Sequence, residues 1–446
     1  MDKDTQITLP FASISGKKVT ADFDGGSLTS DAGVMFLREV ERGIGLIKRL
    51  ADVLKDRRHQ SYVDHSYEAM LRQRVFQIAC GYEDANDCNE LRHDPMIKAA
   101  CERPPISGNE LASQPTMTRL ENSVSRKDMY RMAQTFVDSF LDSYDRPPEA
   151  IILDPDTTDD PTYGDQQLSM FNGYYDETCY LPLHIYEGKS GKLITAILRP
   201  GKRPDGKEIV SILKRLVAYI RRRWPQVKIF LRGDGHFSAP EVHDWCEDND
   251  VYYVLGQTGN PVLKQKAAGV LKHARALYHN TQEKVRLFTS FFYQAESWRK
   301  PRRIICKVDI SSEGENLRFV VTDLKSSRPS FIYDTIYCAR GRTEGYIKNH
   351  KTFLHSDRTS CHSFQANQFR LFLHSAAYVL LHTLAEKGLK GTQWAKVQFN
   401  TLQNRFLKVG ARVCELVTRI KLHFPTAFPL KDVFTTIHSN LEAAFP

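Results

Sequence analysis

Residues 151–160, which read IILDPDTTDD, join a short apolar run to a cluster of four carboxylates. The run is typical of a buried β-strand, and the acids follow it where the strand leaves its sheet. Because side chains alternate along a strand, Asp154 and Asp156 share one face. Like charges gathered there repel one another unless a cation binds or protons are taken up. Taken alone, such a cluster is more often an acidic turn that caps a strand.

The residues that follow predict an α/β sheet built in a definite order. After a strand at 150–153, the pattern predicts strands at 180–187 and 192–199, a helix at 206–224, a strand at 227–231, a helix at 239–249 and a strand at 251–255. Three strands followed by helix, strand, helix and strand is the order of an RNase H-like sheet.

Changes in this pattern divide the chain into four regions. Arg146-Pro147-Pro148 breaks a helical pattern and marks the first boundary. The expected regions are a helical one at 1–146, the sheet at 147–256, a β-rich insertion at 257–335 with strands at 285–293, 303–309 and 317–322, and a helical one at 336–446. The expected fold class is α/β, an RNase H-like mixed sheet with a β-rich insertion and helical N-terminal and C-terminal regions.

The overall charge favours a polyanionic partner. The chain has 446 residues, and 62 Lys and Arg against 53 Asp and Glu leave a net charge of +9. Nucleic acid is therefore the first partner to consider, although many soluble proteins carry a similar excess.

The cysteines and the apolar segments exclude several other classes. No two of the nine cysteines are separated by only two residues, so neither a zinc knuckle nor a redox pair is indicated. The first eleven residues carry charges where a signal peptide needs an apolar stretch, and Arg370, His374 and His382 interrupt the most apolar late segment. We expect a cytoplasmic protein that does not span a membrane.

A second acid follows another apolar strand, in residues 229–237, IFLRGDGHF. Ligands of open α/β sheets gather at the carboxyl ends of strands, which is where Asp234 is expected. The glycines on either side of it permit a sharp turn or a close approach to a ligand. Taken alone, Gly-Asp-Gly is also an ordinary turn.

A third acid lies in a more specific pattern. Tyr337, Arg340, Glu344 and Lys351 are spaced by three, four and seven residues, so they share one face if the segment is helical. An acid beside two bases and a phenol suits a phosphate site, with Glu344 on a metal ion and the bases on phosphate oxygens. The alternative is a solvated helix face with an Arg340–Glu344 pair.

These motifs together resemble the Asp-Asp-Glu (DDE) transposases of bacterial insertion sequences. The spacing from Tyr337 to Lys351 resembles their Tyr-Arg-Glu-Lys signature. The stretches LDPDTTDD at 153–160, GYYD at 173–176, RGDGHF at 232–237 and LKVGA at 407–411 resemble the "thirteen-eighty" group of these elements. The resemblance covers about residues 23 to 430, with independent motifs in the same order.

The resemblance implies an RNase H-like catalytic domain with a β-insertion between the second acid and the glutamate. Carried over by position, the three acids are Asp156, Asp234 and Glu344. Asp156 is preferred as the first acid because a hydroxyl residue follows it, but Asp154 stays open as an additional or alternative metal ligand. Two Mg²⁺ or Mn²⁺ ions about 4 Å apart would serve phosphodiester cleavage.

The resemblance also implies DNA as the partner. Trp298, Arg299 and Arg302 lie in an aromatic and basic stretch suited to stacking a base and following phosphates, although a Trp in the core of the insertion is at least as favoured. Tyr337, Arg340 and Lys351 are further candidate contacts, and the helical N-terminal region is a candidate DNA-binding region. The expected function is cleavage of the element's terminal inverted repeats and transfer to target DNA by a dimer. The alternatives are a catalytically silent DNA-binding protein and an RNase H-like nuclease without strand transfer.

Overall fold

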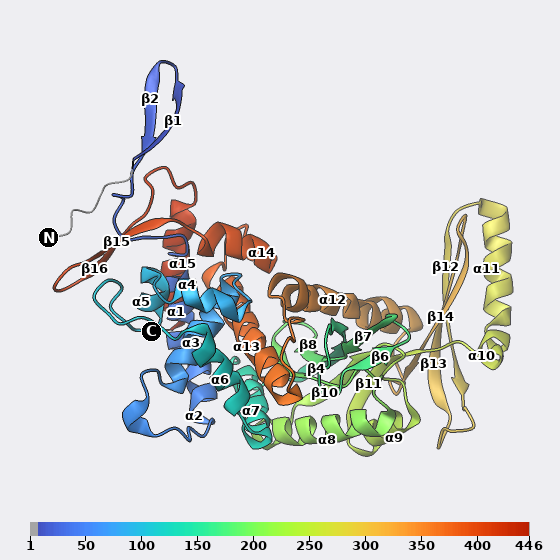
Figure 1. Ribbon diagram of the computed structural model, residues 1–446. Helices are drawn as coiled ribbons and strands as arrows, with labels where there is room; N and C mark the ends of the chain where they lie inside the picture. The colour runs from blue at the N-terminus through green and yellow to red at the C-terminus, as the bar shows by residue number, and fades with distance from the viewer. Residues whose placement is uncertain (1–7, 446) are drawn as a thin grey trace. The chain divides into compact units, whose positions relative to one another are not determined.

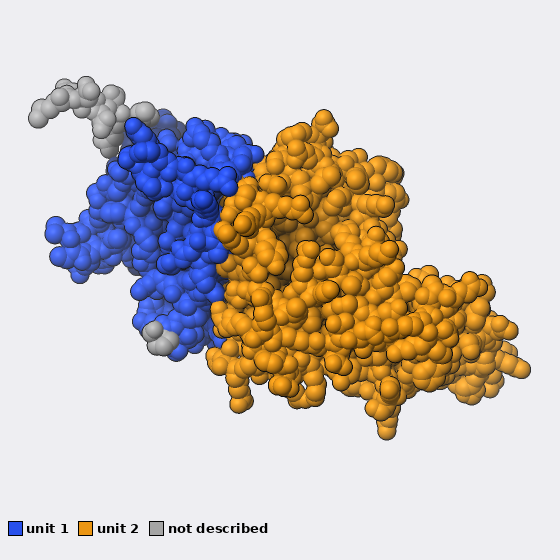
Figure 2. Space-filling model, turned by 90° about the horizontal axis from the view of Figure 1, so that it is seen from below, with its two compact units in different colours: residues 1–123, 376–446 blue, residues 124–375 orange. Residues whose placement is uncertain are grey.

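The computed structural model describes residues 8–445 and divides the chain into two compact units, coloured separately in Figure 2. Unit 1 comprises residues 1–123 and 376–446, and unit 2 comprises residues 124–375. Residues 1–7, on which the expectation about a signal peptide partly rests, lie outside the described residues. Among the described helices, none is both long and apolar enough to cross a membrane.

Unit 2 is built on an eight-stranded mixed sheet with the order β12-β13-β14-β11-β10-β4-β8-β9 (Figure 1). Its strands are β4 (Ala150–Thr157), β8 (Leu183–Glu187), β9 (Leu193–Ile197), β10 (Lys228–Gly233), β11 (Val251–Gln257), β12 (Val285–Tyr293), β13 (Arg302–Ser311) and β14 (Gly314–Thr322). β10 runs parallel to β4 and β11, and the other neighbours are antiparallel. The strands lie where the sequence predicts them.

One face of this sheet carries the main core of unit 2. It packs against α7 (Arg126–Asp142), α8 (Gly206–Arg223) and α9 (Pro240–Asp248). Asp205 caps α8 by accepting a hydrogen bond from the backbone of Glu208, and three arginines in its last turn suit the negative end of the helix dipole. These helices bury the face of β4 and β10 that does not carry Asp154 and Asp156.

The opposite face is covered by a continuous helical run at 331–353. Its parts are the π-helical η3 (Phe331–Tyr337), the 3₁₀ turn η4 (Cys338–Arg340), α12 (Gly341–Lys348) and the π-helical η5 (Asn349–Phe353). Ile332 and Tyr333 pack on Val254 and Val320 of the sheet. This packing fixes the run over the strand ends that carry the acids.

The insertion differs from its prediction in two ways. Its first part is helical, with α10 (Pro261–Lys266) capped by Asn260 and α11 (Ala268–Thr281) after it. Its strands form no separate subdomain, because β14 pairs with β11 and extends the central sheet. The pairing satisfies backbone groups of β11 that would otherwise form an open edge.

The unit boundaries also differ from the four predicted regions. α7 belongs to unit 2 because it packs against β9 and α8, so the division falls at 123/124 and not at 146/147. The last part of the chain, from residue 376, returns to unit 1. A sequence pattern cannot show this return, because it depends on contacts between distant segments.

Shorter elements of unit 2 are β5 (Asp160–Pro161), β6 (Met170–Asn172) and β7 (Glu177–Tyr180), and α13 (Phe364–Thr383) runs from unit 2 into unit 1.

Unit 1 is mainly helical, as predicted, but also contains strands that were not expected. Its elements are β1 (Leu9–Ile14), β2 (Lys17–Ala21), β3 (Leu28–Thr29), α1 (Val34–Ile44), α2 (Leu46–Asp52), η1 (Gln60–Tyr62), α3 (Tyr67–Ala79), η2 (Ala85–Asp87), α4 (Cys88–Leu91), α5 (Pro95–Ala100), α6 (Gln114–Ser123), η6 (Leu384–Gly388), α14 (Phe399–Leu402), η7 (Gln403–Leu407), β15 (Ala411–Glu415), β16 (Ile420–His423) and α15 (Lys431–Ala444). The prediction of a helical C-terminal region is wrong at β15 and β16. β15 pairs with β3, almost 400 residues earlier, and no local pattern reveals such a partner.

Candidate active site

Asp156 and Asp234 lie at equivalent positions on neighbouring parallel strands. Leu153 of β4 is paired with Leu231 of β10, and each acid follows its leucine by three residues. Both side chains therefore leave the sheet at the same edge, where the carboxyl ends of parallel strands gather ligands. Glu344 is exposed on α12, in the helical run that covers this face.

Asp154 is held by a buried partner. It is 0% exposed, and its two carboxylate oxygens accept hydrogen bonds from Nε and Nη2 of Arg232, the first at 2.7 Å. Thr343 Oγ1 donates a third hydrogen bond at 3.2 Å. Burial raises the pKa of Asp154, and the contacts with Arg232 oppose that rise. Both oxygens of this carboxyl group thus accept hydrogen bonds from other side chains of the protein.

Arg232 is a further residue of this site, to which the sequence alone assigns no role. It is 2% exposed and also donates to the backbone oxygen of Ile336 at 2.8 Å. The missed signal was an arginine within an apolar strand, because a buried guanidinium requires an acceptor nearby. The same contact leaves no room at Gly188, where a Cβ would lie 2.5 Å from Arg232 Nη2 and from Asp154 Oδ2.

Asp156 has a different environment. Its side chain is 14% exposed, and Oδ2 accepts a hydrogen bond from Arg340 Nη1 at 3.0 Å. Burial raises the pKa of Asp156 to about 6, Arg340 opposes the rise, and Asp234 and Glu344 add to it. Asp234 and Glu344 therefore lie near enough to Asp156 to raise the free energy of its charged form.

The remaining residues of the predicted stripe also face the sheet. Tyr337 is half-buried, and its hydroxyl lies 2.7 Å from where a Cβ on Gly256 would stand, so the glycine makes room for it. Lys351 Nζ lies 2.9 Å from Asp159 Oδ2 and 3.4 Å from Thr158 Oγ1. The helical run thus directs a phenol and two cations toward the strand ends.

The carboxylates do not form a ready metal cage. Within residues 8–445, no three Asp, Glu, His or Cys side chains lie close enough together to hold an ion as they stand. Arg340 provides the positive charge beside Asp156 in this arrangement. The donor set itself, Asp156 and Asp234 at the strand ends and Glu344 on α12, has the chemistry for a hard divalent ion, provided that Arg340 gives up its contact and the carboxylates move closer together.

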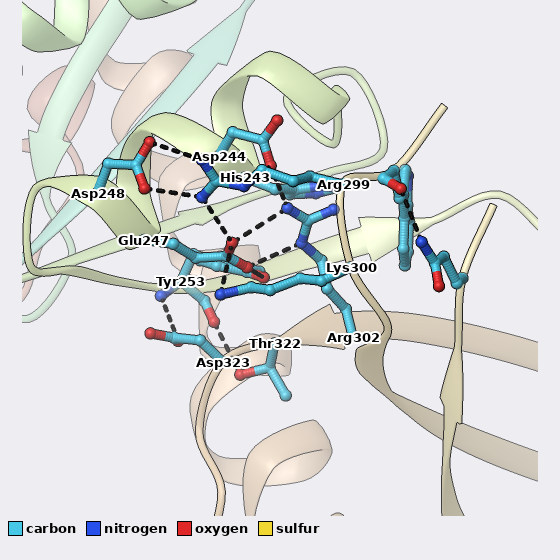
Figure 3. Close-up of polar contacts among 12 residues, drawn as sticks. His243, Asp244, Glu247, Asp248, Tyr253, Arg299, Lys300, Arg302, Thr322 and Asp323 are labelled. Atoms are coloured by element: carbon cyan, nitrogen blue, oxygen red, sulfur yellow. Dashed lines mark hydrogen bonds and ion pairs between the residues drawn. The ribbon is translucent and has the colours of Figure 1, made fainter. Parts of the chain in front are cut away.

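The predicted DNA-contact stretch at 298–302 lies instead against α9, where its arginines form an ion-pair network (Figure 3). Trp298 is 6% exposed and packs on His243 and Tyr293, with the Arg302 guanidinium 5.1 Å from the centre of its ring. Its place in the main core agrees with the alternative of a core Trp. A role in stacking DNA bases would require it to leave this packing.

The arginines of this stretch differ in exposure. Arg302 has a side chain 1% exposed and donates to Glu247 at 2.8 and 3.1 Å and to Asp244. Arg299 is half-exposed and pairs with Asp248 at 2.7 Å. Arg302 therefore has no free face for a phosphate, whereas Arg299 does.

The network makes stability depend on pH through Glu247. Burial alone would raise the pKa of Glu247, but hydrogen bonds from Arg302, Tyr253 and Lys300 lower it to about 2. A carboxylate with a depressed pKa in the folded state contributes stability above its unfolded pKa of about 4.3, and loses it as the pH falls toward 2. Glu247→Gln is expected to lower the free energy of unfolding by about 1–3 kcal/mol at pH 7, and by less at pH 3.

Thermal unfolding of Glu247→Gln and of the unchanged chain at both pH values measures this difference. Glu313→Gln, at an exposed acid on the β13–β14 turn, is the matched control and should unfold like the unchanged chain. A gap between the Glu247 variant and the unchanged chain that is as wide at pH 3 as at pH 7 would contradict the assignment.

The comparisons with known proteins place the chain in a family. Residues 11–445 match the model of the family described as Transposase DDE domain group 1. The chain belongs to this family, and it is therefore a DNA transposase of the DDE class. The resemblance found in the sequence is confirmed at this level.

One solved structure similar to the chain is a cryo-EM structure of a piggyBac transposase synaptic complex with hairpin DNA. It is 11% identical, the similarity covers 94% of this chain and 86% of that chain, and the TM-score is 0.44. No curated protein matches the chain.

Proposed function

We propose that this transposase cuts the terminal inverted repeats of a bacterial insertion sequence and joins them to target DNA, with Asp156, Asp234 and Glu344 as its catalytic carboxylates. The observation that carries the proposal is the register of β4 and β10, which brings Asp156 and Asp234 to equivalent positions; burial raises the pKa of Asp156 there, and Asp234 and Glu344 add to the rise. Charge repulsion of this kind is what a bound cation relieves. Membership of the "thirteen-eighty" group rests on the motifs quoted above.

The strand order supports an RNase H-like assignment for unit 2. The first five strands of its eight-stranded sheet along the chain lie in the spatial order β9-β8-β4-β10-β11, with β10 parallel to β4 and β11 parallel to β10. The predicted order of three strands, helix, strand, helix and strand is present here. The proposed acids then lie at the end of the first strand, at the end of the fourth strand and on the helical run after the insertion.

Mg²⁺ or Mn²⁺, as two ions, is the proposed cofactor. When bound, the ions would supply an activated water and neutralise charge that develops on the phosphoryl group. Asp156, Asp234 and Glu344 would hold them. Asp154 is left out of this set because Arg232 and Thr343 already bind its oxygens.

The cations of the helical run are proposed to bind the DNA backbone. Arg340 and Lys351 now pair with Asp156 and Asp159, and either guanidinium or ammonium can exchange a carboxylate for a phosphate oxygen. Tyr337 is a further hydrogen-bond donor at the same edge. Arg299 remains a candidate phosphate contact, while Trp298 and Arg302 are proposed to stabilise the insertion.

Double-stranded DNA, as element ends and as target, is the proposed partner, and two ends are expected to require a dimer. The helical part of unit 1 is proposed to contribute to binding of the ends. The positive net charge is consistent with this partner.

The proposal is tested by the reaction of the purified chain with DNA that carries the repeats flanking its coding region. With Mg²⁺ the chain should nick the ends, and with ends already cut it should form joined products. Glu344→Gln should lose both reactions, by about 10³-fold or more, because it removes a ligand of the ion that stabilises the developing charge. Its binding of end DNA in a gel shift should persist.

The two alternatives give different outcomes. Gel-shift activity without cleavage under any divalent metal would identify a silent DNA-binding protein. Cleavage without joined products from precut ends would identify a nuclease that lacks strand transfer.

A further inference from the structure

The segment between β4 and β8 is a small sheet that starts and ends at the proposed active site. β5, β7 and β6 pair in that order, and the segment leaves β4 after Thr157, the residue that follows Asp156. It returns in β8, where His184 is the cross-strand partner of Asp156. The small sheet is therefore joined to the catalytic edge at both ends.

This segment is unusually rich in exposed apolar side chains. Five of the ten large apolar side chains that are exposed in unit 2 lie within residues 163–174. They are Tyr163 (95% exposed), Leu168 (51%), Met170 (41%), Phe171 (63%) and Tyr174 (82%). Burying such side chains is favourable, so a concentration of them beside a binding site indicates a partner.

The turn that carries Tyr174 is fixed by hydrogen bonds. Asn172 Oδ1 accepts from the backbone nitrogens of Tyr174 and Tyr175 at 2.9 and 3.4 Å, and Asn172 Nδ2 donates to the backbone oxygen of Gly201 at 2.7 Å. Asp176 closes the turn with a φ of 57°. Because the backbone is held, exposure of Tyr174 does not follow from a loose loop.

The same turn is connected to the proposed catalytic residues. β5 begins at Asp160, four residues after Asp156, and it pairs with β7 through Asp160–Tyr180 and Pro161–Cys179. Glu177, the first residue of β7, shares a hydrogen bond with Asp159, which also pairs with Lys351. Tyr174 therefore lies on a turn that leads into β7, and β7 is linked through Glu177 and Asp159 to Lys351 of the helical run.

We propose that Tyr174, supported by Tyr163 and Phe171, stacks on an unpaired base of the DNA strand whose phosphate lies at Asp156. This inference rests on the proposed function and adds a positioning element to it. Aromatic rings bind unstacked bases through their faces, whatever the base sequence. Trp298 is buried in the core, so the exposed aromatic surface beside the acids is on this small sheet and not on the insertion's Trp.

The inference is tested by binding alone, without catalysis. The probe is a fluorescein-labelled duplex, either blunt or with a single-stranded 3′ thymidine tail of about five nucleotides, a length within the site sizes that aromatic platforms cover. Anisotropy in EDTA measures the affinity of the full chain for both probes. The unchanged chain should prefer the tailed probe, and Tyr174→Ala should weaken its binding by about 5-fold to 100-fold with the blunt probe unaffected.

Two further variants identify the cause. Tyr174→Phe keeps the ring and should keep the preference for the tail, because stacking does not need the hydroxyl. Tyr130→Ala removes a 52% exposed tyrosine from α7 in the same unit and should bind both probes like the unchanged chain.

Several results would overturn the inference. These are no tail preference in the unchanged chain, an equal loss on both probes for Tyr174→Ala, or a loss for Tyr174→Phe as large as for Tyr174→Ala. A change in oligomeric state without a change in tail binding would assign the surface to a second copy of the chain. The anisotropy assay contains no metal, so its result does not depend on whether the chain cleaves DNA. The stacking proposal and the proposed function can therefore fail separately.

Discussion

Asp156→Asn is expected to reduce Mg²⁺-dependent end cleavage by about 10³-fold or more while leaving thermal stability unchanged or higher. The activity falls because a neutral amide is a poor ligand for a hard ion. Such an ion stabilises the charge that develops in the transition state by several kcal/mol. Stability does not fall because the folded state already disfavours the charge at this position. The pKa of Asp156 is raised to about 6 by burial and by the two other acids, so an uncharged side chain removes repulsion. Cleavage assays and thermal unfolding in EDTA measure the two effects.

Asp165→Asn is the matched control for this variant. Asp165 is an exposed acid nine residues further along the chain, and its replacement should change neither cleavage nor stability. Cleavage by Asp156→Asn at the rate of the unchanged chain would remove Asp156 from the catalytic set. If Asp154 were the first acid instead, Asp154→Asn would abolish cleavage and leave stability unchanged. We expect Asp154→Asn to lose stability, because Arg232 and Thr343 bind the buried Asp154 carboxylate.

The sheet of unit 2 could be predicted because its signals are local. β4, β10 and β11 are short apolar runs bounded by turn residues, and α8 shows the period of an amphipathic helix between them. The positions of Asp156 and Asp234 follow from the same pattern, because an acid after a parallel strand is placed by that strand alone. The spacing from Tyr337 to Lys351 could likewise be read, since it needs only a helical segment.

The features that were missed depend on distant partners. The face shared by Asp154 and Asp156 is evident from the sequence, but the difference between them arises from Arg232 on β10 and Thr343 on α12. Pairing of β14 with β11 and of β15 with β3 likewise joins segments that give no sign of each other. The burial of Trp298 follows from contacts with His243 and Tyr293, whereas its sequence neighbours are mostly basic.

Arg232→Met is expected to lower the free energy of unfolding by about 3–5 kcal/mol, the largest stability effect among these variants. The substitution leaves the Asp154 carboxylate buried without its cation and removes a donor from the Ile336 carbonyl. For a unit of about 250 residues, the midpoint of thermal unfolding should fall by roughly 10 °C. Arg299→Met is the matched control, because its pair with Asp248 is about half-exposed on both sides, is screened by solvent and should contribute little to stability. Equal losses in the two variants would contradict a structural role for the Arg232–Asp154 pair.

The double variant Arg232→Met with Asp154→Leu separates stability from positioning. Replacing both members of a buried ion pair by apolar residues is often neutral, so most of the lost stability should return. Cleavage should remain reduced, because Arg232 and Asp154 also connect β10 and β4 to Ile336 and Thr343 of the helical run that carries Arg340 and Glu344. Loss of that connection should lower kcat more than it weakens binding of end DNA. Full recovery of cleavage together with stability would show that the pair serves the fold alone.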